Sequence, residues 1–186
     1  KKYVQKHPKF KKLNIEIIDT GKDTSISKRI FKVKKNIISK NFLLMNGDAI
    51  FDFNLKKIFK DHIINKSDLT FIGAENNLSY GTVGIKKNRI VSFERNITFN
   101  SVKTKKDKNL VAYVYSGMSI LNQKVLEIKF KNFENFEKQL YPLIIKKHKC
   151  DFKVFNGFWH SVDNAKDIES IKRENNFNKY TKLKKL

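Results

Sequence analysis

The stretch FLLMNGD, residues 42–48, is the strongest indication of the fold. Its four consecutive apolar residues are typical of a strand that is buried on both faces of a sheet. The run stops at Asn46-Gly47-Asp48, which is a common turn sequence. Open α/β sheets also bind ligands at such positions, beyond the carboxyl ends of their strands. Asp48 would be placed there to hold a hard cation such as Mg²⁺ on a phosphate.

The segments on either side of this stretch indicate an α/β protein. Residues 14–18 alternate between polar and apolar side chains, which predicts a strand that ends at Asp19-Thr20-Gly21. Apolar residues recur at helical spacing over residues 26–37 and again over 55–63, which predicts two helices. Residues 69–73 predict the next strand. The order strand, helix, strand favours a parallel sheet with crossover helices.

Shorter strands and two more helices are predicted in the second half of the chain. The predicted elements are strands at residues 82–85, 89–93, 111–121 and 152–155, a polar loop at 98–108, a helix at 133–148 that Pro142 interrupts, and a helix from Asp163 or Asn164. No Pro-rich or Gly/Ser-rich linker divides the chain, so we expect a single domain over residues 1–186 with a frayed basic tail at 179–186.

Charge and cysteine content limit the choice of compartment and partner. The formal charge of +22 comes mostly from lysines spread along the chain, and a genome rich in A/T codons would give this composition without a functional demand. A lone cysteine, Cys150, excludes an intramolecular disulfide, and we expect it to be a partly buried core residue in a reducing compartment. No apolar run can span a bilayer and no signal-peptide pattern opens the chain, so we expect a cytoplasmic protein without a membrane partner.

A second group of polar and aromatic residues, GFWHSVDNAKD, occupies residues 157–167. Asp163 follows the aromatic run and lies where a helix is predicted to begin. Its side chain either caps that helix or acts as a second metal ligand. His160 receives no catalytic role, because a lone histidine is more often a packed or surface residue.

Three stretches together resemble the sugar-1-phosphate nucleotidyltransferases, and among them the glucose-1-phosphate cytidylyltransferases. Members of that group carry segments like VDTGxxTMTGGRLKRV, YGDGVADxxI and GFWQxMDTLRDK. This chain has IDTGKDTSISKRIFKV from Ile18, NGDAIFDFNL from Asn46 and GFWHSVDNAKD from Gly157, in the same order and at similar spacing. The resemblance implies a Rossmann-like, three-layer α/β fold of the GT-A-like kind, with a sheet that is incomplete on its N-terminal side.

The resemblance also implies an enzyme of nucleotide-sugar and polysaccharide biosynthesis that uses Mg²⁺. The phosphate oxygen of a hexose 1-phosphate would attack the α-phosphorus of a nucleoside triphosphate, CTP in this subgroup, and pyrophosphate would leave. Asp48 and Asp163 would be the catalytic residues, because they would together hold the metal that bridges the phosphates. A homo-oligomer is implied as well.

Further nucleotide-contacting positions of the family are matched by Thr24, Arg29 and Gly47. Where the cytidylyltransferases have a Gly-Gly pair before the arginine, this chain has Ser27-Lys28. Side chains at positions of close backbone approach would alter base binding. Transfer of a guanylyl or another nucleotidyl group is therefore an open alternative.

The sugar-phosphate pocket of the family is resembled by three short segments. They are Tyr80-Gly81, Phe93-Glu94-Arg95 and Ser116-Gly117. Glu94 and Arg95 depart from the family's Phe-x-Glu-Lys pattern and can also be surface residues of a strand. Gly117 can also be an ordinary glycine within a strand.

A glycine-rich loop resembling GGxGTRL and a Pro-Lys element, with which family members open, are absent from the sequence. In the family these segments hold the triphosphate, so we expect a truncated chain or a fragment that can be inactive by itself. A non-catalytic regulatory or scaffold remnant of the same fold is the alternative function. A basic nucleic-acid-binding protein is a third possibility, which the scattered lysines and the lack of a recognition motif disfavour.

Overall fold

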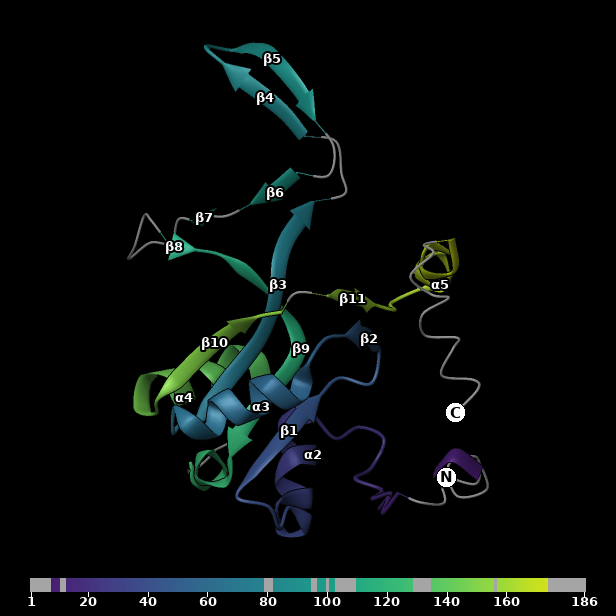
Figure 1. The fold of residues 1–186 in the computed structure, drawn as a ribbon, viewed down its shortest axis with the longest axis vertical. Helices are drawn as coiled ribbons and strands as arrows, with labels where there is room; N and C mark the ends of the chain where they lie inside the picture. The colour runs from purple at the N-terminus through teal and green to yellow at the C-terminus, as the bar shows by residue number, and fades with distance from the viewer. Residues whose placement is uncertain are drawn as a thin grey trace.

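A mixed β-sheet lies at the centre of the molecule and carries helices on both faces (Figure 1). The computed structural model describes residues 8–10, 13–78, 82–94, 97–99, 101–102, 110–128, 135–155 and 157–173. Its helices are η1 (Pro8–Phe10), α2 (Ile26–Val33), η2 (Lys34–Asn36), α3 (Leu55–Ile64), η3 (Gln123–Glu127), the π-helix η4 (Phe136–Leu140), α4 (Tyr141–Lys147) and α5 (Ala165–Arg173). Its strands are β1 (Asn41–Met45), β2 (Ala49–Asp52), β3 (Leu69–Leu78), β4 (Thr82–Lys86), β5 (Arg89–Glu94), β6 (Ile97–Phe99), β7 (Ser101–Val102), β8 (Leu110–Val111), β9 (Tyr113–Asn122), β10 (Cys150–Val154) and β11 (Phe158–Ser161).

The central sheet has the strand order β1-β9-β3-β10. β10 runs parallel to β3, whereas β9 runs antiparallel to both β1 and β3. The prediction of a parallel sheet is therefore correct for the directions of β1, β3 and β10 and wrong for β9. The chain reaches β9 through a series of short antiparallel strands rather than a crossover helix, so it enters the sheet in the opposite direction.

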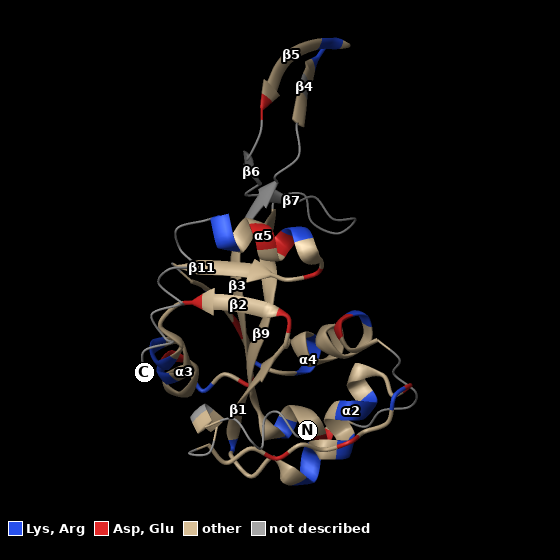
Figure 2. Cartoon of the chain, turned by 90° about the vertical axis from the view of Figure 1, so that its right-hand side faces the viewer, with Lys and Arg blue, Asp and Glu red and all other residues tan. Residues whose placement is uncertain are grey.

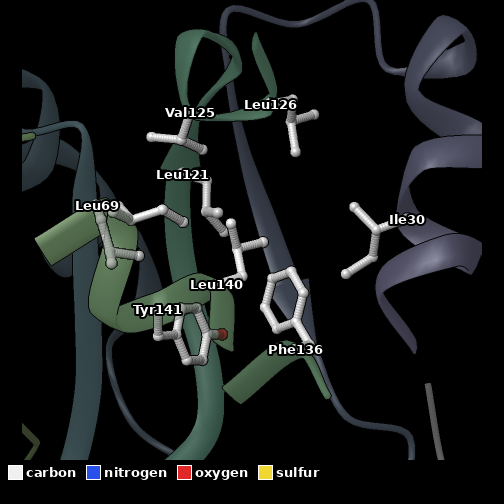
Figure 3. Packing of buried hydrophobic residues seen from close by; sticks show 9 residues of the cluster. Ile30, Leu69, Leu121, Val125, Leu126, Phe136, Leu140 and Tyr141 are labelled. Atoms are coloured by element: carbon white, nitrogen blue, oxygen red, sulfur yellow. The ribbon is translucent and has the colours of Figure 1, made fainter. Parts of the chain in front are cut away.

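Two hydrophobic clusters fill the space between the sheet and the helices. The first joins Ile30 of α2 to Leu69 and Leu121 of the sheet and to residues of η4 and α4, as Figure 3 shows. The second joins Ile58 of α3 to Ile72 and other residues on the opposite face of the sheet. Alternate residues of each strand point to opposite faces, so one strand contributes to both clusters. The predicted three-layer α/β fold is confirmed.

The helices begin at polar caps that the sequence supplies. The Ser25 side chain accepts from the N–H of Lys28 at the start of α2, and Asn54 accepts from the N–H of Lys57 at the start of α3. The predicted irregularity at Pro142 is present, because the π-helix η4 gives way to α4 next to this residue. No helix within the described part of the chain is long and apolar enough to cross a membrane.

Two predictions about the N-terminal third are wrong. Residues 14–18 form no strand, and Ile15 is 44% exposed, because no described strand lies beside them to accept their backbone hydrogen bonds. The predicted burial of the apolar run 42–45 on both faces is also wrong in part, since Met45 is 45% exposed. β1 lies at the edge of the described sheet, and β9 is its only neighbour there. Cys150, by contrast, is half-buried against the first cluster as predicted.

A buried carboxylate at the start of β3 joins three segments of the fold. Asp68 accepts from the Nζ of Lys124 at 2.5 Å, from Nδ1 of His148 at 3.2 Å and from the backbone N–H of Lys149 at 3.2 Å. Burial raises the pKa of Asp68, but these donors outweigh burial and hold the pKa below its ordinary value of 3.8. The ionised Asp68 therefore stabilises the folded state at pH values above its ordinary pKa. This contribution to the free energy of unfolding is lost as the pH falls through the lowered pKa of the folded protein.

Replacing Asp68 by asparagine should lower the free energy of unfolding by about 1–3 kcal/mol at pH 7. At pH 3 or below the difference should shrink, because protonation weakens the same contacts in the unchanged protein. Urea unfolding followed by circular dichroism at both pH values measures this. Asp61→Asn is the control, since the ion pair of Asp61 with Lys153 is about one-third exposed and its loss should cost less than about 1 kcal/mol. Equal costs for the two variants would contradict the prediction.

Candidate functional site

A short antiparallel strand pair joins two segments that lie far apart in the sequence. β2 pairs with β11, and Ala49 lies opposite Ser161. The pairing continues by one residue, because the N–H of Val162 donates to the carbonyl of Asp48 at 2.7 Å. Asp48 and Asp163 therefore lie at the same end of this pair. Figure 2 shows β2 and β11 side by side with α5 next to them.

The end of β1 and the middle of β9 complete the surroundings. The N–H of Asn46 donates to the carbonyl of Gly117 at 2.9 Å, and the indole N–H of Trp159 donates to the carbonyl of Ser116 at 2.9 Å. Gly117 has a φ of +78°, and a Cβ added to it would lie 2.9 Å from the side-chain nitrogen of Asn46. Gly117 is therefore no ordinary strand glycine, because its conformation and its close neighbour both exclude a side chain.

These segments enclose a pocket of about 320 Å³. It is lined by Asn46, Asp48, Ala49, Tyr115, Ser116, Gly117, Glu137, Trp159, Ser161 and Asp163. Three of these residues are acidic, and Glu137 comes from the π-helix η4 rather than from the two motifs that supply the other acids. The pocket thus combines carboxylates with aromatic and backbone groups, which suits a polar ligand that carries hydroxyls or a bound cation.

Asp163 does not cap α5. The side chain of Asn164 accepts from the N–H of Lys166 at 2.9 Å, and the side chain of Asp167 accepts in return from the N–H of Asn164 at 2.9 Å. This reciprocal arrangement provides the helix cap. The carboxylate of Asp163 accepts only a hydroxyl bond from Ser161, at 3.1 Å, within the described residues. It remains available to a ligand in the pocket.

The side chains present fit a hard divalent cation. The carboxylates of Asp48 and Asp163 offer oxygen atoms, and neither forms an ion pair with another described residue. No group of three or more His, Cys, Asp or Glu side chains in the described ranges is arranged to hold a metal. A cation bound by this pair would therefore take its other ligands from water and phosphate, as Mg²⁺ commonly does.

Tyr115 connects the pocket to the hydrophobic core. The hydroxyl of Tyr115 lies 2.7 Å from the hydroxyl of Tyr141. The hydroxyl of Ser119 lies 3.2 Å from the same Tyr141 hydroxyl. Burial raises the pKa of Tyr115 and also the pKa of Tyr141. Both phenols are therefore neutral near pH 7, and their hydrogen bonds fix the ring of Tyr115 at the pocket wall.

Three residues predicted to contact substrate do not line this pocket. Thr24 precedes α2, and Arg29 lies within this helix. The guanidinium of Arg29 donates to the backbone carbonyls of Thr24 at 2.7 Å and Lys22 at 3.1 Å. Glu94 ends the β4–β5 hairpin, which projects beyond the end of β3 (Figure 1). Tyr80, Gly81 and Arg95 lie outside the described residues.

Two other predicted positions have a defined local environment. Ser27 and Lys28, which replace the glycine pair of the cytidylyltransferases, belong to α2; Ser27 is buried and Lys28 is exposed. Gly47 lies between two pocket residues, and a Cβ there would meet no atom within 4 Å. The space beside Gly47 is therefore open to a ligand.

Several pocket residues were not predicted. Trp159 and Ser161 belong to the motif at residues 157–167, and their alternation with Asp163 in the sequence could have indicated a shared face. The sequence did not indicate Glu137 as a pocket residue, because the apolar spacing of its helix predicts only which residues face the core.

Comparison with known proteins shows the family of the chain. The sequence profile described as nucleotidyl transferase matches residues 1–176. The chain is 24% identical over 160 residues to the probable glucose-1-phosphate cytidylyltransferase of Bacillus subtilis (strain 168), which covers 86% of this chain and 59% of that protein. It is 27% identical over 172 residues to the bifunctional protein GlmU of Methanocaldococcus jannaschii, covering 89% of this chain and 38% of GlmU.

The crystal structure of HddC from Yersinia pseudotuberculosis has a similar fold, with a TM-score of 0.60 and 19% identity over 91% of this chain and 69% of that chain. The chain is an α/β protein with an acidic pocket at the end of β1. The chain belongs to the nucleotidyl transferase family. It spans 59% of the length of the Bacillus subtilis relative.

Proposed function

We propose that this chain supplies the acidic pocket of a sugar-1-phosphate nucleotidyltransferase. The observation that carries the proposal is that Asp48 and Asp163, from two distant motifs, line one pocket and leave their carboxylates free of ion pairs within the described residues. The reaction would join a nucleoside triphosphate to a hexose 1-phosphate. A phosphate oxygen of the sugar forms the new bond to the α-phosphorus, and pyrophosphate leaves with the electrons of the broken bond.

The residues of the pocket would position the reactants rather than form a covalent intermediate. Asp48 and Asp163 would hold Mg²⁺, which neutralises phosphate charge when it is bound. The open space beside Gly47 would let a phosphate or nucleotide approach the backbone. Asn46, Glu137 and the hydroxyl groups of the pocket would bind sugar hydroxyls, since amide, carboxylate and hydroxyl groups are suitable partners for them.

CTP is the proposed nucleotide because the three motifs and the Bacillus subtilis relative both point to cytidylyl transfer. The relative named GlmU and the Ser27-Lys28 pair make transfer from another nucleoside triphosphate the alternative. We also propose a cytoplasmic enzyme of nucleotide-sugar synthesis that forms a homo-oligomer, as the family resemblance implies.

Pyrophosphate release by the full-length protein tests the function. Each of CTP, GTP, UTP, ATP and dTTP is paired with glucose 1-phosphate or mannose 1-phosphate in buffer with Mg²⁺, and pyrophosphate is measured by a coupled phosphate assay. We expect release with CTP and a hexose 1-phosphate that stops when EDTA is added. Release with another nucleotide would correct the base alone. No release with any pair would contradict the catalytic proposal and favour a non-catalytic homologue.

A further inference from the structure

A second polar cleft lies at the other end of β1. Its volume is about 390 Å³, and it is lined by Lys40, Asn41, His62, Ile63, Lys66, Ser67, Asp68, Asn122 and Lys124. Asn41 begins β1, whereas the acidic pocket starts at Asn46 just after this strand ends. At roughly 3.3 Å per residue, Asn41 and Asn46 are about 16 Å apart along the chain. They share no residue.

Buried polar groups form the floor of this cleft. The side chain of His62 is only 1% exposed. Its Nδ1 atom lies 2.8 Å from the hydroxyl oxygen of Thr70, and its Nε2 atom lies 3.3 Å from Oδ1 of Asn41. The amide of Asn122 also donates to Oδ1 of Asn41, at 2.9 Å. Burial lowers the pKa of His62, so the ring is neutral near pH 7 and can donate through Nε2 to Asn41. The Nδ2 group of Asn41 has no acceptor among the described residues and can donate to a ligand.

The charges on the cleft do not balance. Its one acid, Asp68, is already paired with Lys124 and also accepts from His148 and the backbone of Lys149. Lys40 and Lys66 remain, and neither has an ion-pair partner in the described part of the chain. The cleft therefore presents two cations without an ion-pair partner beside an amide donor, and the nearby carboxylate of Asp151 is bound by the side chains of Ser67 and Asn65.

Lys66 also has an unusual backbone conformation. It follows the C-cap of α3 with a φ of +51°, and the N–H groups of Lys66 and Ser67 close the helix end by donating to the carbonyls of Ile63 and His62 at 3.0 Å and 3.1 Å. Glycine or asparagine is favoured at this position of the motif, because a β-carbon is strained there. The left-handed turn at the end of α3 brings Lys66 into the lining of the cleft.

We propose that this cleft binds a phosphate-type oxyanion, between Lys40 and Lys66 and against the amide of Asn41. The binding group is either free inorganic phosphate or the phosphate of a small metabolite. This proposal is independent of the chemistry of the acidic pocket, because the three acids of that pocket repel an anion when no metal is present.

The test is an NMR titration of the full-length protein with inorganic phosphate in buffer that contains EDTA and no divalent cation. We expect saturable shifts of the backbone signals of Lys66 and Asn122. Lys66→Gly should weaken binding roughly tenfold, as expected for loss of one charge-assisted hydrogen bond. Its Tm should be unchanged or higher, because glycine relieves the backbone strain.

Two further variants separate this site from general charge effects and from the acidic pocket. The first is a double variant of the cleft, Lys40→Ala with Lys66→Gly. The second is a control double variant, Lys146→Ala with Lys147→Ala, which removes the same charge from exposed positions of α4 outside the cleft. Only the first pair should abolish saturation, and Asp48→Asn should leave the phosphate affinity unchanged. Equal weakening by both lysine pairs, or shifts confined to Ser116 and Gly117, would overturn the proposal. A phosphorylated sugar that saturates the same signals at lower concentration would identify a metabolite rather than free phosphate as the ligand.

Discussion

Replacing Asp163 by asparagine should lower the rate of pyrophosphate release by a factor of about 10² to 10³, the size found for loss of one electrostatic group at a transition state. Asparagine keeps the shape of the side chain and an oxygen that can accept from Ser161, so the loss reports the missing charge. Without that charge, the pocket holds a divalent cation less tightly and leaves the phosphates unneutralised. Asp48→Asn should have an effect of similar size.

Asp52→Asn is the matched control, because Asp52 lies at the far end of β2 and does not line the pocket. Circular dichroism and thermal unfolding verify that all variants fold. The double variant of Asp48 and Asp163 should lose little more activity than either single variant, since groups that act as a unit are not additive. Full activity of Asp163→Asn, in a folded protein at limiting Mg²⁺, would remove the basis of the proposed function.

Replacing Gly157 by alanine should have the largest effect on the fold. A Cβ on this residue would overlap the backbone carbonyl of Asp52, a group that cannot rotate away as a flexible side chain can. Relief of the overlap requires β11 to separate from β2 near Phe158, the residue that pairs with Asp52. We expect a loss of about 2–4 kcal/mol in the free energy of unfolding, typical of overpacking at a site that cannot relax.

Urea unfolding and pyrophosphate release together measure this effect. Activity should fall with stability, because β11 carries the chain to Asp163. Gly47→Ala is the companion variant: its new methyl group meets no protein atom within 4 Å, so stability should be unchanged while nucleotide affinity falls. If Gly157→Ala were as stable as the unchanged protein, the close approach of the two backbones would not be present in solution.

The sequence predicted the layered fold well because its helices have strongly one-sided apolar patterns. It predicted β9 as a strand but not its direction, which depends on how the preceding short strands return the chain to the sheet. The segment 14–18 was misassigned because alternation describes side chains, whereas a strand also needs a neighbouring backbone.

The candidate site was predictable where short motifs carried it. Asp48, Asp163 and Gly117 were predicted as site residues, and all three line one pocket. Arg29 was not placed there, because local backbone carbonyls accept from its guanidinium, and sequence similarity does not reveal such competition. Glu137 could not be identified in advance, since the packing of η4 against the sheet brings it to the pocket.

The residues of β2 and β11 pair one to one, and this register sets the positions of Asp48 and Asp163 relative to each other. A slip of this register by one position would turn every following side chain to the other surface. An insertion or deletion within residues 49–52 or 158–161 would therefore move Asp48 away from Asp163 even if no side chain were altered. Changes in length are expected to be tolerated at the β4–β5 tip, around Lys87 and Asn88, and not in these eight positions.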